Sequence, residues 1–242
     1  MAAPLVLVAA SGLAREVLAM VRRDGGHKVV GFLDDDASRH GTMVDGVPVL
    51  GGIDAVTSVP DAELLVCAGR GTARERIVGR LEANGVLPHR YATVLHPAVE
   101  VPDGCEVGAG SILLAGTVMT TAVTLGEHVV VMPNVTLTHD CVVRDFATLC
   151  AGVSLGGAVV VGRGAYVGMN ASVRENVRIE AGATLGMGAV LLTQAPSGST
   201  WAGVPARPVE RPRDGGGPGP VAPHDVSSTS DAARHAERKV AQ

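Results

Sequence analysis

A histidine followed directly by an aspartate is the feature of this sequence best suited to chemistry. His139 stands in the run Thr138-His139-Asp140. A carboxylate beside an imidazole can fix its tautomer and raise its basicity, as a general base requires. Taken alone, such a pair is more often a solvated surface feature, so its meaning depends on the elements that hold it.

The histidine lies within a repeat of six residues. From Val101 to Leu191 every sixth residue is a branched or long aliphatic one, and the residue two positions before it is nearly always small. This period differs from the 3.6 residues of a helix and from the spacing of propeller blades. It is typical of a parallel β-helix, here of about five triangular coils with the aliphatic side chains inward. His139, two residues past the inward Leu137, is therefore expected on the outside or at a corner. Glycines follow the aliphatic residue where little side-chain bulk is expected at the corners, at 108, 126, 156, 162, 168 and 186.

The first ninety residues have another pattern, in which apolar strands alternate with helices. We expect strands over 4–9, 28–33 and 63–68, with helices over 15–23 and from 69–71 to 83. This order predicts a small parallel-sheet α/β domain, Rossmann-like in type. The predicted domains are the α/β domain over 1–90, the β-helix over 91–211 and a disordered tail over 212–242, which is rich in Pro, Gly, Ser and charge.

The loop after the first strand could bind a nucleotide. It reads Ala9-Ala10-Ser11-Gly12-Leu13, with one glycine where a dinucleotide fingerprint has three, so a full NAD site is not expected. Asp34 ends the second strand, where an acid can bond a ribose hydroxyl. A nucleotide or nucleotide-sugar site on the helix N–H groups, and a domain that binds nothing, both remain open.

Composition narrows the range of partners and locations. The formal net charge is −4 and only 2% of residues are aromatic, without a basic cluster, which argues against nucleic acid. The sequence has no apolar stretch of about 18 residues and no signal-peptide pattern, so we expect no membrane partner. The sequence has four cysteines without CxxC spacing: Cys67, Cys105, Cys141 and Cys150. The three within the repeat are interpreted as small core residues, and we expect a reduced, cytoplasmic protein.

The run from Thr138 to Val143, set in hexads after an α/β domain, resembles the bacterial sugar acyltransferases of the NeuD and PglD kind. Gly-Val-Pro-Ala-Arg at 203–207 resembles the closing motif of many hexapeptide acyltransferases, and the resemblance covers roughly 4–210. It implies a left-handed β-helix, an exception to the usual right-handed crossover. It also implies a homotrimer, with acyl-CoA, expected to be acetyl-CoA, in the cleft between neighbouring β-helices, and no metal.

The resemblance also implies roles for single residues. His139 matches the catalytic base, and Asp140 matches the acid that tunes it. Positions matched to CoA are Gly157, whose N–H faces the thioester oxygen, Met169 and Met187, with the closing-motif residues Gly203, Pro205 and Arg207. Positions matched to the nucleotide sugar are Ser11, Gly12, Leu13, Asp34 and Asp35.

The implied reaction is direct transfer. His139 removes a proton from an amine or a hydroxyl of a sugar or nucleotide sugar, which attacks the thioester carbonyl. A backbone N–H such as that of Gly157 holds the oxyanion, and His139 then protonates the CoA thiolate. The sequence decides neither between N- and O-acylation nor the length of the acyl chain.

Departures from the family pattern leave alternatives open. The first loop is unusual, Thr148 stands where a second histidine is common, and Met132-Pro133 replaces a common Asn-Thr pair. The acceptor could therefore be a small molecule without a nucleotide. The chain could also be a non-catalytic scaffold or binding protein. A γ-type carbonic anhydrase would need three histidines for zinc, whereas the repeats hold only His128 and His139.

Overall fold

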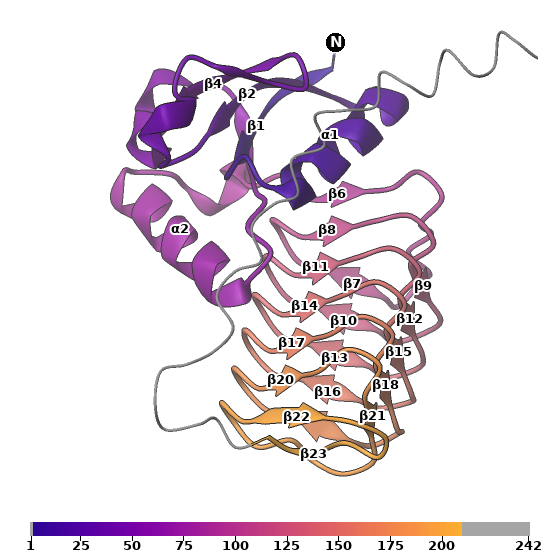
Figure 1. The fold of residues 1–242 in the computed structure, drawn as a ribbon. Coiled ribbons are helices and arrows are strands. Elements are labelled where there is room, and N and C mark those ends of the chain that lie inside the picture. Colours follow the sequence, from indigo (N-terminus) through magenta and orange to yellow (C-terminus); the bar gives the residue numbers. More distant parts are fainter. Residues whose placement is uncertain (1, 210–242) are drawn as a thin grey trace, which may run out of the picture. The chain divides into compact units, whose positions relative to one another are not determined.

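The chain forms a small N-terminal α/β domain followed by a left-handed parallel β-helix (Figure 1). The structure, a computed structural model, describes residues 2–209. The predicted disordered tail and the last two residues of the predicted β-helix domain lie outside this range. No helix in the described range is both long and apolar enough to cross a membrane.

The α/β domain is built on a five-stranded sheet in the order β3-β4-β2-β1-β5. Its strands β1, β2 and β5 are parallel, as the alternation of strands and helices predicted. The elements are β1 (Ala3–Val8), α1 (Gly12–Asp24), β2 (His27–Leu33), η1 (Ala37–Arg39), β3 (Met43–Val44), β4 (Val47–Gly51), η2 (Ile53–Ser58), β5 (Glu63–Val66), α2 (Gly71–Ala83) and η3 (Pro88–Arg90).

Helix α1 begins three residues earlier than the sequence pattern suggested. The Ser11 hydroxyl accepts a hydrogen bond from the Ala14 N–H at 3.2 Å, which is the contact of an N-cap. A cap satisfies a backbone donor that the first helical turn cannot satisfy itself. The first loop is therefore short, and the N–H groups of Gly12 and Leu13 lie in the first turn of the helix.

Short strands make the three faces of the β-helix; from β7 to β21 each has two residues and begins six residues after the one before, and they pair in parallel from coil to coil. The final pair, β22 and β23, is antiparallel. We name each face by an early strand. The β7 face has β7 (Glu106–Val107), β10 (Thr124–Leu125), β13 (Val142–Val143), β16 (Val160–Val161) and β19 (Arg178–Ile179). The β8 face has β6 (Val94–Leu95), β8 (Ile112–Leu113), β11 (Val130–Val131), β14 (Thr148–Leu149), β17 (Tyr166–Val167), β20 (Thr184–Leu185), β22 (Thr200–Ala202) and β23 (Arg207–Pro208). The β9 face has β9 (Val118–Met119), β12 (Thr136–Leu137), β15 (Ser154–Leu155), β18 (Ser172–Val173) and β21 (Val190–Leu191).

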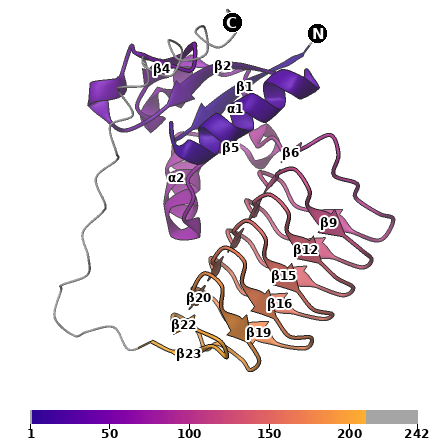
Figure 2. The ribbon, with the colours of Figure 1, turned by 45° about the vertical axis from the view of Figure 1, so that its right-hand side comes forward.

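The chain runs from the β8 face to the β9 face, then to the β7 face and back, so three columns of corners separate the faces. We call the corners between the β9 and β7 faces the histidine corner, because it holds His139. Those between the β7 and β8 faces form the α2 corner, and those between the β8 and β9 faces, with Met169 and Met187, form the methionine corner. Figure 2 shows these coils stacked below the α/β domain.

The corners repeat one backbone conformation. A residue with positive φ recurs every six positions, three after each inward aliphatic residue, and about half of these are not glycine, including His128, Asn134, Asp140 and Asn170. The glycines directly after the aliphatic residue are needed for another reason. A Cβ at Gly162 would lie 2.5 Å from the backbone nitrogen of Ala181 in the next coil. These glycines make room for the neighbouring coil, which refines the expectation from sequence.

The inward aliphatic residues form one continuous core along the β-helix, with Leu137, Leu155 and Val173 among its buried members. A second core joins α1 and the α/β sheet to the start of the β8 face, where Ile112 and Val130 pack against the first domain. Contacts over the described range are dense enough that residues up to 209 form one compact unit. The domain boundary at residue 90 stays a prediction.

Candidate functional site

His139 and Asp140 lie together at the histidine corner, just after β12. The imidazole Nδ1 is 2.7 Å from the Asp140 carboxylate, and both side chains are about 60% exposed. Asp140 has a φ of 61° and donates its N–H to the Thr121 oxygen, at 3.1 Å in the coil before. This corner conformation turns the carboxylate toward the preceding side chain. With Nδ1 held by Asp140, Nε2 is the nitrogen left to exchange a proton with a substrate.

Gly157 lies one coil further along the same corner. A Cβ at this position would come within 2.3 Å of both Cε1 and Nε2 of His139, so the imidazole lies against the glycine backbone. The Gly157 N–H donates to no acceptor within residues 2–209. The corner therefore combines a base, the acid that orients it and an available backbone donor, which are the parts needed to move a proton and hold an oxyanion.

The two histidines of the repeats are on different corners. His128 is 3% exposed at the α2 corner, between the rings of Tyr91 and Phe146, and burial lowers its pKa to about 4. It cannot share an ion with His139 within one chain. Over the described range no three His, Cys, Asp or Glu side chains cluster as metal ligands.

A cavity of about 400 Å³ opens on the β8 face, between the first turns of α1 and α2. The predicted residues Ser11, Gly12 and Leu13 line it, with Gly69, Arg70, Val130, Met132, Thr148, Cys150 and Tyr166. No lining residue is acidic. The Ser11 hydroxyl is already used, because it donates to the Cys67 oxygen at 2.6 Å and caps α1. What the loop offers a ligand is therefore its backbone N–H groups.

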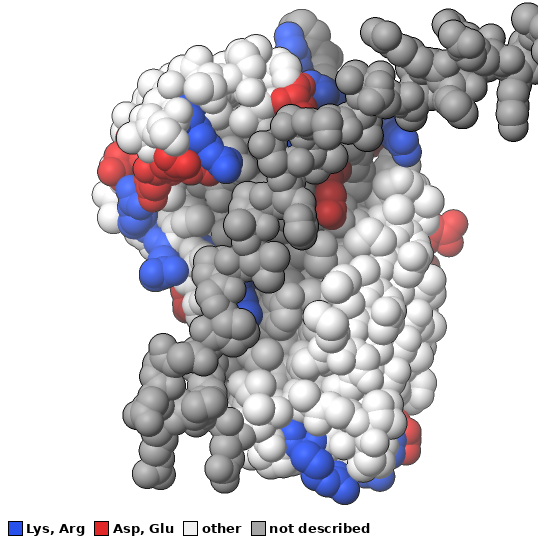
Figure 3. Space-filling model, in the orientation of Figure 1, with Lys and Arg blue, Asp and Glu red and all other residues white. Residues whose placement is uncertain are grey.

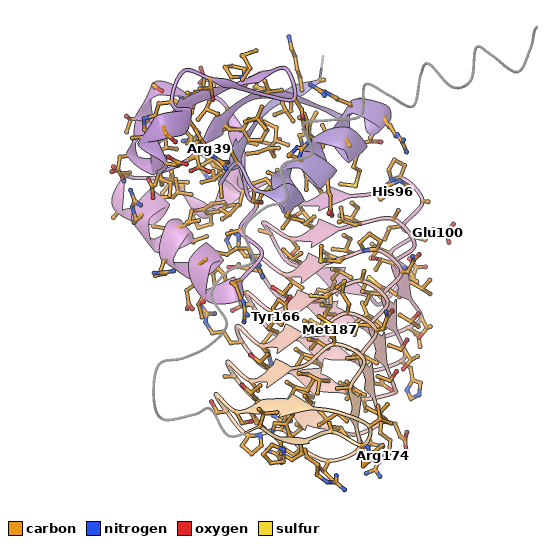
Figure 4. The ribbon with its side chains drawn as sticks, viewed as in Figure 1. Arg39, His96, Glu100, Tyr166, Arg174 and Met187 are labelled. Carbon is orange, nitrogen blue, oxygen red and sulfur yellow. The ribbon has the colours of Figure 1, made fainter. Side chains whose placement is uncertain are left out.

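Sequence reasoning missed Arg70 and Tyr166 in this cavity. The Arg70 guanidinium lies 4.5 Å from the centre of the Tyr166 ring, so α2 and β17 meet through a cation–π contact. Figure 4 labels Tyr166 beside the start of α2. The Gly69-Arg70-Gly71 run was a signal for Arg70, since it opens a helix directly after a buried strand. Nothing local marks Tyr166.

The predicted acids of the first domain line a second cavity, of about 360 Å³, on the other side of the first loop. Both Asp34 oxygens are occupied by backbone donors, from Ala10 at 2.7 Å and Asp36 at 2.9 Å, so this carboxylate holds the loop in shape. Asp35 pairs with Arg80, whose hydrogen bond is the main cause of a lowered Asp35 pKa. The sequence predicted that the Asp34 carboxylate would bond a ribose hydroxyl. In the structure both of its oxygens already accept hydrogen bonds from the backbone.

The positions matched to CoA are divided between corners. Met169 and Met187 lie in successive coils of the methionine corner, 47% and 73% exposed, and Figure 4 labels Met187 on this flank. Gly203, Pro205 and Arg207 lie at the last coil, in and after the turn between β22 and β23. Of these predicted residues, only Gly157 shares a corner with His139.

The surface around the methionine corner is unusually poor in charge. Figure 3 shows this flank of the β-helix as an almost unbroken area without Lys, Arg, Asp or Glu, with charged residues at its lower end and on the α/β domain. Exposed apolar side chains on the β9 face and its corners include Val118, Met169, Met187 and Leu192. Such a surface is typical of a face that meets another protein.

Comparisons with known proteins agree with this architecture. Residues 4–81 match the family model of the PglD N-terminal domain. The acetyltransferase domain of PglB from Neisseria gonorrhoeae is 28% identical, over 85% of this chain and 99% of that one, with a TM-score of 0.78. PerB from Caulobacter crescentus, in complex with CoA and GDP-perosamine, is 25% identical over 86% and 97%, with a TM-score of 0.78. No curated protein matches the sequence. Residues 4–81 thus form a PglD N-terminal domain, and the chain as a whole has the architecture of solved sugar acetyltransferases of the NeuD and PglD type.

Proposed function

We propose that this protein transfers an acetyl group from acetyl-CoA to the amino group of a nucleotide sugar. The observation that carries the proposal is His139, held by Asp140 at 2.7 Å and lying against the backbone of Gly157. The acetyltransferase domain of PglB, at 29% identity, has a structure with acetyl coenzyme A. PerB from Caulobacter crescentus, in complex with CoA and GDP-perosamine, and a mutant perosamine N-acetyltransferase from the same organism with the same ligands support an amine as acceptor rather than a hydroxyl.

In the proposed mechanism His139 acts through Nε2. It takes a proton from the acceptor amine as the nitrogen attacks the thioester carbonyl, while Asp140 stabilises the imidazolium that forms. The Gly157 N–H stabilises the tetrahedral oxyanion. When this intermediate collapses, the C–S bond breaks and the imidazolium returns its proton to the CoA thiolate. The acetyl group has then moved to the amine nitrogen and one proton from that nitrogen to the CoA sulfur, with no change of oxidation state, and the enzyme regains its starting state.

We propose that two protomers make each active site. The histidine corner is on the opposite side of the triangular coil from the β8 face, so His139 cannot reach the β8-face cavity of its own chain. The uncharged flank with Met169 and Met187 is the surface by which protomers would associate, as a homotrimer. CoA would lie in the cleft between neighbouring β-helices, with Gly203, Pro205 and Arg207 at its end.

We propose that the nucleotide sugar spans the two cavities of the first domain. Its diphosphate would meet the N–H groups of Gly12 and Leu13 at the start of α1, a favourable place for an anion. The nucleoside would occupy the cavity beside Asp35, while Asp34 shapes the loop between. The sugar would then extend into the β8-face cavity, toward His139 of the neighbouring protomer.

A cytoplasmic location is part of the proposal. All four cysteines are free thiols, three of them buried, as suits a protein of a reducing compartment.

A thiol-release assay with acetyl-CoA tests the function, using amino-sugar nucleotides, hydroxyl-bearing sugar nucleotides and free sugars as acceptors. We expect release with an amino-sugar nucleotide, and a loss of about 100-fold or more in kcat for His139→Ala. Because His139 is exposed, the melting temperature should hardly change. His89→Ala, which removes another exposed histidine, is the matched control and should keep full activity. Full activity in His139→Ala would refute the mechanism, and activity only with free sugars would refute the nucleotide-sugar acceptor.

A further inference from the structure

Arg74 is a charged side chain with no exposed surface, on the side of α2 that faces the β-helix. Its guanidinium donates to six acceptors at 2.8–3.1 Å: the oxygens of Ala68, Gly69, His128, Phe146 and Ala147 and the Thr148 hydroxyl. These acceptors come from the loop before α2, from the α2 corner and from β14. The side chain thus joins the two domains, and every N–H has a partner.

The charge of Arg74, unlike its hydrogen bonds, is left without a partner. All six acceptors are neutral, and no carboxylate in residues 2–209 forms an ion pair with it. Burial lowers its pKa to about 10, so the group stays protonated at neutral pH. A buried guanidinium is ordinarily paired with an acid, because removing an ion from water is costly.

The unpaired charge lies directly behind the wall of the β8-face cavity. Two of its acceptors, the Gly69 oxygen and the Thr148 hydroxyl, belong to residues that line the cavity, and Thr148 also donates to Gly69 at 2.9 Å. Arg70 and the first turns of α1 and α2 add positive potential on the same side. The cavity lining contains no acid to balance them.

We infer that Arg74 is a positioning residue for the acceptor. The diphosphate of the acceptor would supply the negative charge that no side chain of the cavity lining provides. Arg74 acts through Gly69 and Thr148, holding the cavity wall and contributing its field without touching the ligand. This inference rests on the proposed function, since it requires an acceptor with an anionic group. It predicts selection for nucleotide-linked sugars over neutral sugars. It also predicts an effect on the KM of the acceptor and none on the KM of acetyl-CoA.

Two substitutions separate charge from hydrogen bonding. Arg74→Lys keeps the charge with fewer donors, whereas Arg74→Gln keeps donors without the charge. Arg163→Gln is the matched control, because Arg163 also links α2 to the β-helix, through Glu75 and Asp145, but is exposed and lines a different cavity. The measurements are the affinity for inorganic diphosphate by calorimetry, the melting temperature, and KM and kcat with both substrates.

We expect Arg74→Gln to weaken diphosphate binding, and to raise the acceptor KM, by roughly ten- to fiftyfold, the order expected when one unit of nearby positive charge is lost. Arg74→Lys should stay within about threefold of wild type despite a lower melting temperature, since its charge is unchanged. Arg163→Gln should match wild type in binding.

If Arg74→Lys and Arg74→Gln lose diphosphate affinity equally, in proportion to their loss of melting temperature, Arg74 is only a structural link between the domains. That result would overturn the inference. If Arg74→Gln does not fold, the test rests on Arg74→Lys. Loss of diphosphate binding in a folded Arg74→Lys protein would then refute the inference. Wild-type protein that binds no diphosphate while acetylating a neutral sugar would instead refute the nucleotide-sugar acceptor. Unchanged binding in Arg74→Gln, with an active wild type, refutes only the role of Arg74.

Discussion

At the scale of single residues, the absence of a side chain at position 157 matters as much as the presence of His139. Gly157→Ala would place a Cβ within 2.3 Å of the imidazole, so the ring must turn away from the backbone donor. We expect kcat to fall by about 10- to 100-fold, because a small misplacement of a base is costly. The melting temperature should change little, because the imidazole that must move is about 60% exposed and can turn into solvent. Steady-state kinetics with acetyl-CoA measure the effect.

Gly79→Ala is the control for this substitution. It makes the same chemical change on an exposed side of α2, where nothing lies within 4 Å of the new Cβ, and should leave kcat unaltered. A fully active Gly157→Ala enzyme would show that the contact between ring and backbone is not used in catalysis.

His128 makes stability depend on pH. Its folded pKa is about 4, lowered by burial and by the nearby Arg74 charge, against about 6.5 when unfolded. As pH falls below 6.5 the unfolded chain binds the proton first, so this contribution to stability is complete above 6.5 and is lost toward pH 4. The loss amounts to at most about 3 kcal/mol. Urea unfolding at pH 7, 6 and 5 should show this decline.

His128→Asn should reduce that decline, because asparagine tolerates the residue's φ of 53° and has no titrating group. Carboxylates titrate in the same range, so the difference between wild type and variant is the quantity to compare. Identical pH dependence in the two proteins would contradict a neutral, buried His128.

At the scale of elements, the left-handed corner position determines which residues fit. Ala122 has a φ of 52° on the exposed surface, a conformation strained for alanine and easy for glycine. Ala122→Gly should therefore leave the free energy of unfolding equal or raise it by about 1 kcal/mol. Ala115→Gly, in the same kind of corner but without positive φ, should lower it by about 0.5–1 kcal/mol. Denaturant unfolding of both variants checks the contrast, and equal destabilisation would contradict the corner argument.

The same scale shows what the sequence could predict. The hexads predicted the strands and the inward residues, because each repeat places the same side chains on the same face as its neighbours. The predicted start of α1, at residue 15, lies three residues after the observed start at Gly12, because the position of the cap depends on a single contact of the Ser11 hydroxyl. The six partners of Arg74 come from segments 54–74 residues away as well as nearby, and so leave no local pattern. Tyr166 and the two cavities likewise depend on how the domains pack.

At the scale of the whole molecule, the opposed positions of His139 and the β8-face cavity lead to a complementation test. His139→Ala removes the base and Arg70→Glu damages the cavity, so each variant alone should be inactive. If sites form between neighbours in a trimer of three times 24.5 kDa, random one-to-one co-assembly leaves about one site in four with both parts intact. The two co-expressed variants should therefore recover about a quarter of wild-type activity. As a control, a chain that carries both substitutions and is expressed alone should recover none. A co-expressed mixture that forms trimers yet stays inactive would mean that base and cavity must belong to the same chain.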